Sequence, residues 1–247
     1  MKSDRVEWEE LAELDPFWAV LSDPSRKGGR WDLEEFLATG EREVEDALAS
    51  AAKLGLPARR GRALDVGCGV GRITRALAGR FEAALGVDAA TAMIGHAEKL
   101  HTDRPNCAFR LLPATELEAL EAGSFDLVWS VLVLQHLPPE EAERALRSFV
   151  TLLRPEGLAI FRLPYRTRRL HRLQLSRGLY RLARRLGASA ELLLRRTPLT
   201  PMRMTAFPEE RVRAIVDGAG GRVLSVEPYG SQELPTPSRL YFVTPAA

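Results

Sequence analysis

The sequence predicts an α/β protein built on a doubly wound, mainly parallel sheet. Apolar runs typical of strands alternate with helical patterns from residue 62 to residue 163, and a glycine-rich loop follows the first run. The run over 125–133 is almost continuously apolar, as in strands buried on both faces. Such alternation is typical of parallel sheets with right-handed crossovers. A length of 247 residues allows one large domain with additions.

The individual elements follow from local patterns. Strands are expected over 62–66, 83–87, 108–112, 125–133, 157–163, 221–227 and 239–244, and helices over about 71–79, 90–101, 138–153 and 208–219. Before them, Val44, Ala47, Leu48 and Ala51 share one helical face. We expect Thr39 to be the N-cap of that helix and Gly55-Leu56-Pro57 to end it.

The loop after the first strand carries glycines at alternate positions, 67, 69 and 71. A strand, a glycine loop and a helix together bring bare backbone N–H groups to a ligand at a helix N-terminus. Glycine suits this place because a side chain would block the approach and because such turns often need positive φ. Asp65 comes two residues before Gly67, where a carboxylate would oppose a bound pyrophosphate and favour a cationic ligand.

The pattern Asp65-x-Gly67-Cys68-Gly69-x-Gly71 closely resembles motif I of class I, Rossmann-like S-adenosylmethionine-dependent methyltransferases of the small-molecule type. The resemblance covers about residues 62–163. It implies a seven-stranded sheet whose last strand is antiparallel. It also implies S-adenosyl-L-methionine as cofactor, S-adenosyl-L-homocysteine as product, and methyl transfer to an oxygen or nitrogen of a small-molecule acceptor. The resemblance implies that the cofactor is contacted by Asp65, Gly67, Cys68, Gly69 and Gly71.

Asp88 ends the second expected strand, 17 residues after Gly71. A carboxylate there can accept hydrogen bonds from both ribose hydroxyls, in NAD enzymes as well as in methyltransferases. Ala89 and Met93 are expected near the adenine. Many relatives carry an acid after the third strand, but this chain has Pro113 there. The backbone N–H groups of Ala114 and Thr115 remain candidates to read the ring, and Glu116 is an alternative carboxylate.

Residues 124–137 resemble motif IV of small-molecule methyltransferases and its continuation. The resemblance places Ser130 and Val131 near the methionine part of the cofactor, at the carboxyl end of the fourth strand. His136 is the one titratable side chain expected near the methyl group, either as a base for the acceptor or as a local hydrogen-bonding group. Candidate substrate contacts are Trp31, Gln135, His136 and Tyr165.

Charge is divided unevenly along the chain. Residues 162–203 hold twelve arginines and one acid, Glu191, so this segment carries +11 and the rest of the chain −9, for a total of +2. Leu175, Leu179, Leu182 and Leu186 share one helical face, and Gly178 is expected to break the helix. Three interpretations stay open: a lid over the substrate cavity, a contact with an anionic membrane surface, or binding of RNA phosphates.

These patterns divide the chain into an N-terminal helical cap (1–60), a cofactor-binding core (61–163), a basic helical insert (164–204) and the C-terminal part of the sheet (205–247). Tryptophans 8, 18 and 31 either attach the cap or form a lid. No apolar run of ~18 residues or signal peptide is present, and the cysteines and histidines show no metal-ligand spacing. We therefore expect a cytoplasmic, metal-independent enzyme, with a peripheral membrane location as the alternative. The sequence does not indicate an oligomeric state.

Three other functions remain open at this stage. The first is a methyltransferase directed at RNA or at membrane lipids through the basic insert. The second is an NAD-linked oxidoreductase, which Asp65 and the motif IV resemblance disfavour. The third is a non-catalytic protein that binds S-adenosylmethionine.

Overall fold

The computed structural model describes residues 2–166, 175–197, 199, 202–230 and 236–246. Its strands are β1 (Arg62–Val66), β2 (Ala83–Asp88), β3 (Cys107–Leu111), β4 (Phe125–Ser130), β5 (Leu153–Pro164), β6 (Gly221–Tyr229) and β7 (Ser238–Pro245). Its α-helices are α1 (Lys2–Leu14), α2 (Pro16–Val20), α3 (Leu33–Lys53), α4 (Arg72–Ala78), α5 (Thr91–Leu100), α6 (Pro139–Leu152), α8 (Leu175–Arg185), α9 (Ala190–Arg196) and α10 (Glu209–Gly218). Short 3-10 helices cover Pro24–Arg26, Leu117–Ala119 and Leu134–His136.

The strands form one seven-stranded sheet in the order β3-β2-β1-β4-β5-β7-β6. β7 runs antiparallel to both of its neighbours, β5 and β6, and β1 to β5 are parallel. The strand order reverses between β1 and β4, and ligands bind at such a switch point in open α/β sheets. The predicted fold is therefore confirmed, including the antiparallel last strand.

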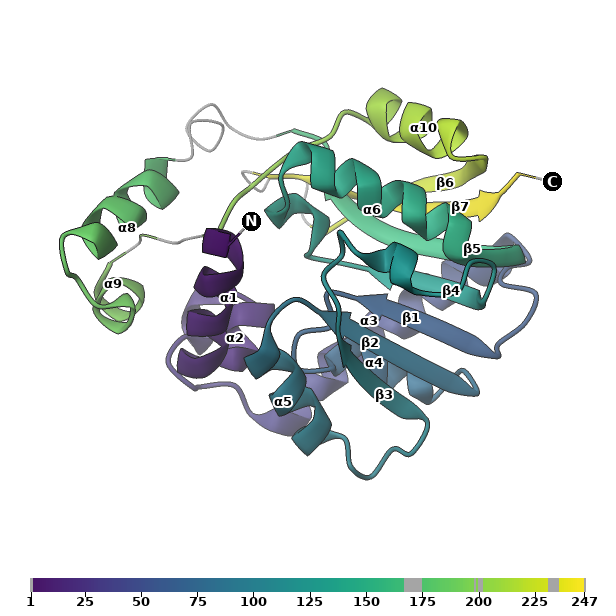
Figure 1. Cartoon of the computed structure of the whole chain (residues 1–247). Coiled ribbons are helices and arrows are strands. Elements are labelled where there is room, and N and C mark those ends of the chain that lie inside the picture. Colours follow the sequence, from purple (N-terminus) through teal and green to yellow (C-terminus); the bar gives the residue numbers. More distant parts are fainter. Residues whose placement is uncertain (1, 167–174, 198, 200–201, 231–235, 247) are drawn as a thin grey trace.

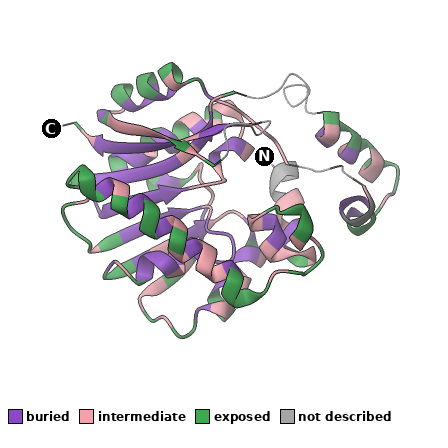
Figure 2. Cartoon of the chain, turned by 180° about the vertical axis from the view of Figure 1, so that it is seen from behind, coloured by how far each residue is buried: buried purple, intermediate pink, exposed green. Residues whose placement is uncertain are grey.

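Helices cover both faces of the sheet (Figures 1 and 2). On one face α6 and α10 pack on residues such as Val128 and Phe161, and on the other α3 and α4 pack on Leu127 and Ile160. Because alternate residues of β4 and β5 point to opposite faces, both strands are apolar on both sides. Most strand bounds agree with the prediction to within two residues, and the two larger differences are in β4 and β5. β4 ends at Ser130 rather than at residue 133, and β5 begins at Leu153 rather than at residue 157.

The N-terminal helices form a third apolar cluster beside the sheet, to which Leu11, Trp18, Phe36, Val70 and Met93 contribute. One prediction for this region is wrong. The N-cap of α3 is Asp32, whose side chain accepts a hydrogen bond from the Glu35 N–H at 2.9 Å. Thr39 lies within the helix, and its hydroxyl donates to the Phe36 carbonyl at 2.6 Å. The helix thus begins two turns earlier than expected, because Asp32 is a strong cap followed by two acidic residues.

The basic segment forms α8 and α9, which lie at the edge of the molecule beside α1 (Figure 1). The prediction that Gly178 breaks the helix is wrong, because α8 is continuous through it. Glycine in a helix costs only about 1 kcal/mol relative to alanine. Ion pairs between α8 and α1 accompany the continuous helix. The part of the predicted insert over 167–174 lies outside the described residues. No helix among those that the structure describes is long and apolar enough to cross a membrane.

Candidate functional site

The loop between β1 and α4 has the backbone that its glycines predict. Gly67, Gly69 and Gly71 have φ values of 75°, 53° and 84°, a region that side-chain-bearing residues rarely adopt. The loop is tied to β2, because the N–H groups of Gly67 and Cys68 both donate to the Val87 carbonyl, at 2.7 and 3.0 Å. A Cβ on Gly67 would lie 2.3 Å from a methyl group of Val133. Only glycine allows so close an approach.

A cavity opens above this loop at the carboxyl edge of the sheet, and with its mouth it encloses about 760 Å³. A concave, mainly apolar site at the switch point of an α/β sheet is a common place for a small-molecule ligand. Its walls come from the core (Gly67, Gly69, Asp88, Ala89, Met93, Ala114), the segment after β4 (Val131, Leu132, Val133, His136, Leu137) and the cap (Trp8, Ala19, Val20). The first group includes six of the residues that the sequence assigns to the cofactor.

Asp88 is the acid of this cavity. One carboxylate oxygen accepts the Gly69 N–H and the other accepts the Ala90 N–H, both at 2.9 Å. The carboxylate therefore joins the end of β2 both to the glycine loop and to the start of α5. Burial raises the pKa of Asp88, and the backbone hydrogen bonds from Ala90 and Gly69 oppose this shift. Each carboxylate oxygen has further lone pairs, which can accept hydrogen bonds from a ligand that carries two hydroxyl groups.

Asp65, in contrast, does not line the cavity. Its carboxylate is buried and accepts a hydrogen bond from the Thr74 hydroxyl of α4 at 2.7 Å. Burial raises its pKa to about 7, against the lowering effects of the Thr74 hydrogen bond and of the Arg72 charge. In this structure Asp65 thus links β1 to the helix that follows the loop.

Replacement of Asp65 by asparagine should stabilise the protein at high pH. The folded-state pKa of about 7 exceeds the ordinary value of 3.8, so the folded protein holds a proton that the unfolded chain releases. Stability consequently falls as the pH rises from about 4 to 7. Asparagine keeps an acceptor for Thr74 and removes this loss. At pH 8 the free energy of unfolding of Asp65→Asn, measured with denaturant, should exceed that of the wild type by up to about 4 kcal/mol, since one pKa unit corresponds to about 1.4 kcal/mol. A difference that is the same at pH 4 and pH 8 would contradict the assignment.

The cap reaches the cavity through α1. The Trp8 ring meets the His136 ring edge-on, with 5.2 Å between the ring centroids. The carboxylate of the next residue, Glu9, accepts the N–H groups of Thr91 and Ala92 at 2.7 and 2.9 Å, at the N-terminus of α5. A carboxylate at this position is favoured by the helix dipole. Glu9 therefore fixes α1 against the core and holds Trp8 over the cavity.

His136 lies in the wall next to Trp8, within the 3-10 helix after β4. Its Nδ1 is 2.7 Å from the Arg203 carbonyl, which can only accept, so Nδ1 carries the proton. The lone pair is then on Nε2, which accepts a hydrogen bond from the side-chain nitrogen of Gln135 at 3.3 Å. Burial lowers the pKa of His136 to about 4, despite the hydrogen bond to Arg203. The ring is therefore neutral near pH 7 and can accept a proton or a hydrogen bond at Nε2.

Several residues assigned from the sequence lie outside the cavity wall, namely Asp65, Cys68, Gly71, Thr115, Ser130, Trp31, Gln135 and Tyr165. The Ser130 hydroxyl donates to the Val66 carbonyl, and the Trp31 ring packs on Phe36 within the cap. The Tyr165 ring stacks with the Arg239 guanidinium, 4.6 Å from the ring centroid. Among the described residues, no group of three or more His, Cys, Asp or Glu side chains could hold a metal ion.

Sequence reasoning missed the wall residues Ala19, Val20, Leu132, Val133 and Leu137 and did not single out Trp8 among the cap tryptophans. The run 131–134 looks like the end of a strand, so its exit from the sheet has no pattern of its own. Leu132 has a φ of 67°, which is strained for a leucine. Strain of this kind is common at ligand sites, but the sequence gives no signal for it.

Comparison with known proteins matches this site to one family. Residues 64–161, from β1 through β5, match the family model described as a methyltransferase domain. They include the glycine loop, Asp88 and His136. Residues 64–161 are a methyltransferase domain. This match, together with the seven-stranded sheet, confirms the predicted methyltransferase family.

Curated relatives match less than half of the chain. A ubiquinone biosynthesis O-methyltransferase of Acinetobacter baylyi is 31% identical over 103 residues, which are 40% of this chain and 42% of that protein. Another protein of the same name, from Methylococcus capsulatus, is 33% identical over 101 residues with the same coverage. The match thus spans less than half the length of these relatives.

Solved structures resemble the chain over a longer stretch. Magnesium protoporphyrin IX methyltransferase from Synechocystis PCC 6803, with bound SAH, has a TM-score of 0.65 at 19% identity and covers 100% of this chain and 99% of that one. A SAM-dependent methyltransferase from Leishmania major has a TM-score of 0.68 at 16% identity and covers 98% and 82%. At these identities the likeness shows the fold, including the elements outside the methyltransferase domain.

Proposed function

We propose that the protein transfers a methyl group from S-adenosyl-L-methionine to an oxygen or nitrogen of a small-molecule acceptor and releases S-adenosyl-L-homocysteine. The observation that carries the proposal is Asp88, which faces the cavity while its carboxylate holds the Gly69 N–H at 2.9 Å. A ribose diol on Asp88 would place the rest of the cofactor along the glycine loop. The close approach at Gly67, where a Cβ would be 2.3 Å from Val133, fits a ligand laid directly on the backbone.

The chain's own contribution to such a reaction is alignment. S-adenosylmethionine, when bound, supplies a sulfonium that already activates the methyl group, so the protein needs only to bring the acceptor atom into line with it. Effective molarities of about 10⁵–10⁸ M are available from such positioning. Trp8, Ala19 and Val20 close the cavity from the cap side, which excludes water from the reacting atoms.

Oxygen is the acceptor atom best supported. The curated relatives are named as O-methyltransferases, and His136 offers a neutral lone pair at Nε2 in the cavity wall. We infer that an acceptor hydroxyl replaces the Gln135 amide at Nε2, and that Nε2 accepts its proton as the oxygen attacks the methyl group. Trp8, Leu132 and Leu137 surround this position, so the acceptor is expected to carry an apolar ring or chain beside its hydroxyl.

Replacement of His136 by alanine should lower kcat by about 100-fold for a hydroxyl acceptor, which is typical for removal of a general base. The dissociation constant of S-adenosylmethionine should stay the same. Because the pKa of His136 is about 4, its ring stays neutral between pH 6 and 9. Titration of His136 should therefore cause no change in the wild-type kcat over this range. Formation of S-adenosylhomocysteine on a panel of phenols and alcohols measures both effects. If His136→Ala has wild-type kcat over this range, Nε2 takes no part in the reaction.

Calorimetric titration with S-adenosylmethionine, S-adenosylhomocysteine and NAD tests the proposed function itself. Micromolar binding of the first two and none of NAD is the expected result. Binding of NAD alone would replace the proposal with an oxidoreductase, and binding without turnover on any acceptor would leave a cofactor-binding protein. Of the partners expected for the basic segment, a lipid surface has more support than RNA, because the exposed side of α8 is made of leucines.

A further inference from the structure

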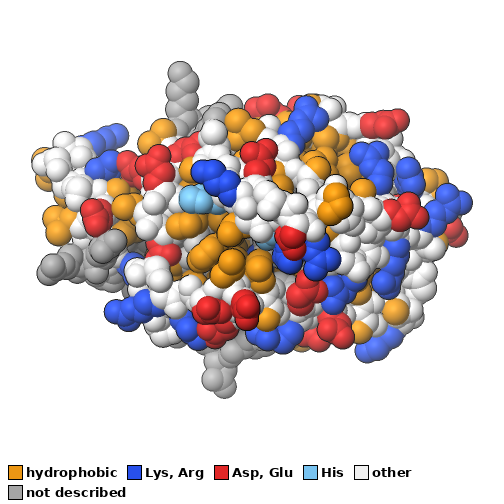
Figure 3. Space-filling model, turned by 90° about the horizontal axis from the view of Figure 1, so that it is seen from below, with side chains coloured by type: hydrophobic (Ala, Val, Ile, Leu, Met, Phe, Trp, Pro, Cys, Tyr) orange, Lys and Arg blue, Asp and Glu red, His pale blue; other side chains and the backbone are white. Residues whose placement is uncertain are grey.

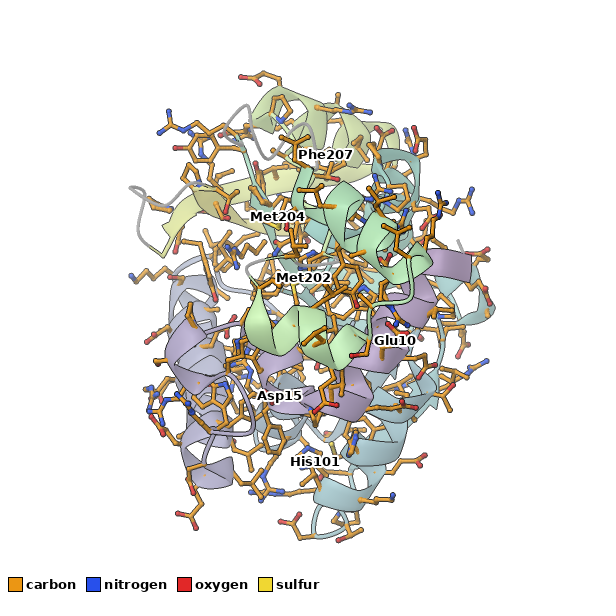
Figure 4. The ribbon with its side chains drawn as sticks, turned by 90° about the vertical axis from the view of Figure 1, so that its left-hand side faces the viewer. Glu10, Asp15, His101, Met202, Met204 and Phe207 are labelled. Atoms are coloured by element: carbon orange, nitrogen blue, oxygen red, sulfur yellow. The ribbon has the colours of Figure 1, made fainter. Side chains whose placement is uncertain are left out.

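The insert helix α8 directs its charged side toward the protein. The Arg177 and Arg181 guanidinium groups contact the Glu7 carboxylate of α1 at 3.4 and 2.6 Å, and Arg184 forms an ion pair with Glu10. The Tyr180 ring is buried among these groups, with its hydroxyl 3.5 Å from Glu10. Figure 4, which views the molecule from the α8–α9 end, shows Glu10 where α1 meets α8. The polar side of an amphipathic helix thus forms its contact with the rest of the chain.

The apolar side of α8 consequently faces outward. Leu175, Leu179 and Leu182 are 50–54% exposed and Leu186 is 80% exposed, and their spacing of 4, 3 and 4 residues places them along one side of the helix. Leu192 of α9 is exposed to a similar degree. Other large exposed hydrophobic residues among those described, such as Leu33 and Leu111, come from separate elements. We call the four leucines at positions 175, 179, 182 and 186 the leucine face.

We propose that the leucine face docks the protein on the surface of an anionic lipid bilayer. An amphipathic helix with leucines on one side and arginines around it lies in the interface of such a bilayer, with its apolar side among the acyl chains. α8 lies at the edge of the molecule and can approach a flat surface (Figure 1). Hydrophobic side chains are visible at this end of the molecule in Figure 3.

Charge favours a lipid surface over a second copy of the chain. Residues 162–203 carry +11 in sequence. Arg177, Arg181 and Arg184 pair with Glu7 and Glu10, whereas Arg185 lies exposed beside the leucine face. Two copies that met through this face would bring two strongly basic segments together. An anionic bilayer instead gains about 1 kcal/mol for each arginine near its surface.

The composition of the leucine face favours lipid over protein or RNA. Protein interfaces depend on Trp, Tyr and Arg anchors, and leucine is under-represented among them. Single-stranded RNA needs exposed aromatic rings for stacking, but the aromatic ring of α8, Tyr180, is buried against α1. Flexible leucine side chains without aromatic anchors suit a fluid acyl phase. The ion pairs between α1 and α8 hold the helix with its leucine face toward the bilayer.

Sedimentation with vesicles tests the proposal independently of methyl transfer. The full chain should bind phosphatidylcholine vesicles that contain phosphatidylglycerol at least about tenfold more tightly than vesicles of phosphatidylcholine alone. Binding should weaken as salt rises toward ~1 M, because salt screens charges outside the bilayer. The double variant Leu179→Gln/Leu182→Gln should bind the anionic vesicles about tenfold or more weakly, because two leucine side chains that would enter the bilayer are lost.

The double variant Leu33→Gln/Leu111→Gln, which changes two exposed leucines on other elements, is the matched control and should bind like the wild type. Binding of S-adenosylmethionine to each variant checks that the core is folded. Three results would overturn the proposal. They are no binding to anionic vesicles, equal loss in the control variant, and a concentration-dependent dimer that the Leu179/Leu182 variant abolishes. The last would identify a second copy as the occupant.

Discussion

Replacement of Asp88 by alanine should weaken binding of S-adenosylmethionine by at least about 100-fold. The variant loses the acceptor proposed for two ribose hydroxyls, and hydrogen bonds to a charged group are worth about 1.5–3 kcal/mol each. It also loses the carboxylate that holds the Gly69 and Ala90 N–H groups at 2.9 Å. Both losses should weaken the binding of S-adenosylmethionine, because the glycine loop and Asp88 line the same cavity. Calorimetric titration of the purified variant measures the effect.

Asp217→Ala, which changes an exposed carboxylate of α10, is a suitable control and should bind like the wild type. Asp88→Asn separates the two roles of the side chain. The amide oxygen of asparagine can still accept a hydrogen bond from one backbone N–H. Asp88→Asn should therefore keep the wild-type melting temperature while its affinity for S-adenosylmethionine falls. Wild-type affinity in Asp88→Ala would place the cofactor elsewhere. A variant that does not fold would leave Asp88→Asn as the deciding measurement.

The order of strands, the glycine loop and Asp88 could be predicted because each depends on a local pattern. Gly67, Gly69 and Gly71 need positive φ, and that need shows directly as glycine in the sequence. Asp88 follows from its distance along the chain to the loop. Asp65 shows the limit of this approach. Its place before the loop suggested a ligand contact, but its carboxylate bonds to Thr74, nine residues later on α4. A neighbour in sequence cannot show which way a side chain turns.

Contacts between distant segments could not be predicted. The hydrogen bonds of Glu9 at the start of α5 help to bring Trp8 to His136, and nothing in the pattern of residues 1–14 indicates that partner. The case of α8 is similar. The spacing of its leucines predicts that they share one side of the helix, but the pattern alone does not say which side faces the protein. Glu7 and Glu10 decide it, because two carboxylates on α1 meet three guanidinium groups on α8.

Replacement of Gly67 by alanine should remove binding of S-adenosylmethionine and lower the melting temperature. A Cβ at this position would lie 2.3 and 2.7 Å from the two methyl groups of Val133. The φ of 75° adds a strain of about 1–2 kcal/mol for any residue with a side chain. The loop cannot relax easily, because the Gly67 N–H donates to the Val87 carbonyl at 2.7 Å. The loop should therefore shift away from Val133 and into the cavity.

The double variant Gly67→Ala/Val133→Ala tests this cause. Removal of the two valine methyl groups relieves the steric part and leaves the φ strain, so the double variant should be more stable than Gly67→Ala by more than additivity allows. Gly95→Ala is the matched control, because Gly95 lies within α5 with no atom within 4 Å of an added Cβ. That variant should gain about 0.5–1 kcal/mol in stability and keep its affinity. If Gly67→Ala binds S-adenosylmethionine like the wild type, the ligand does not rest on this backbone, and the glycines at 67, 69 and 71 serve only the turn.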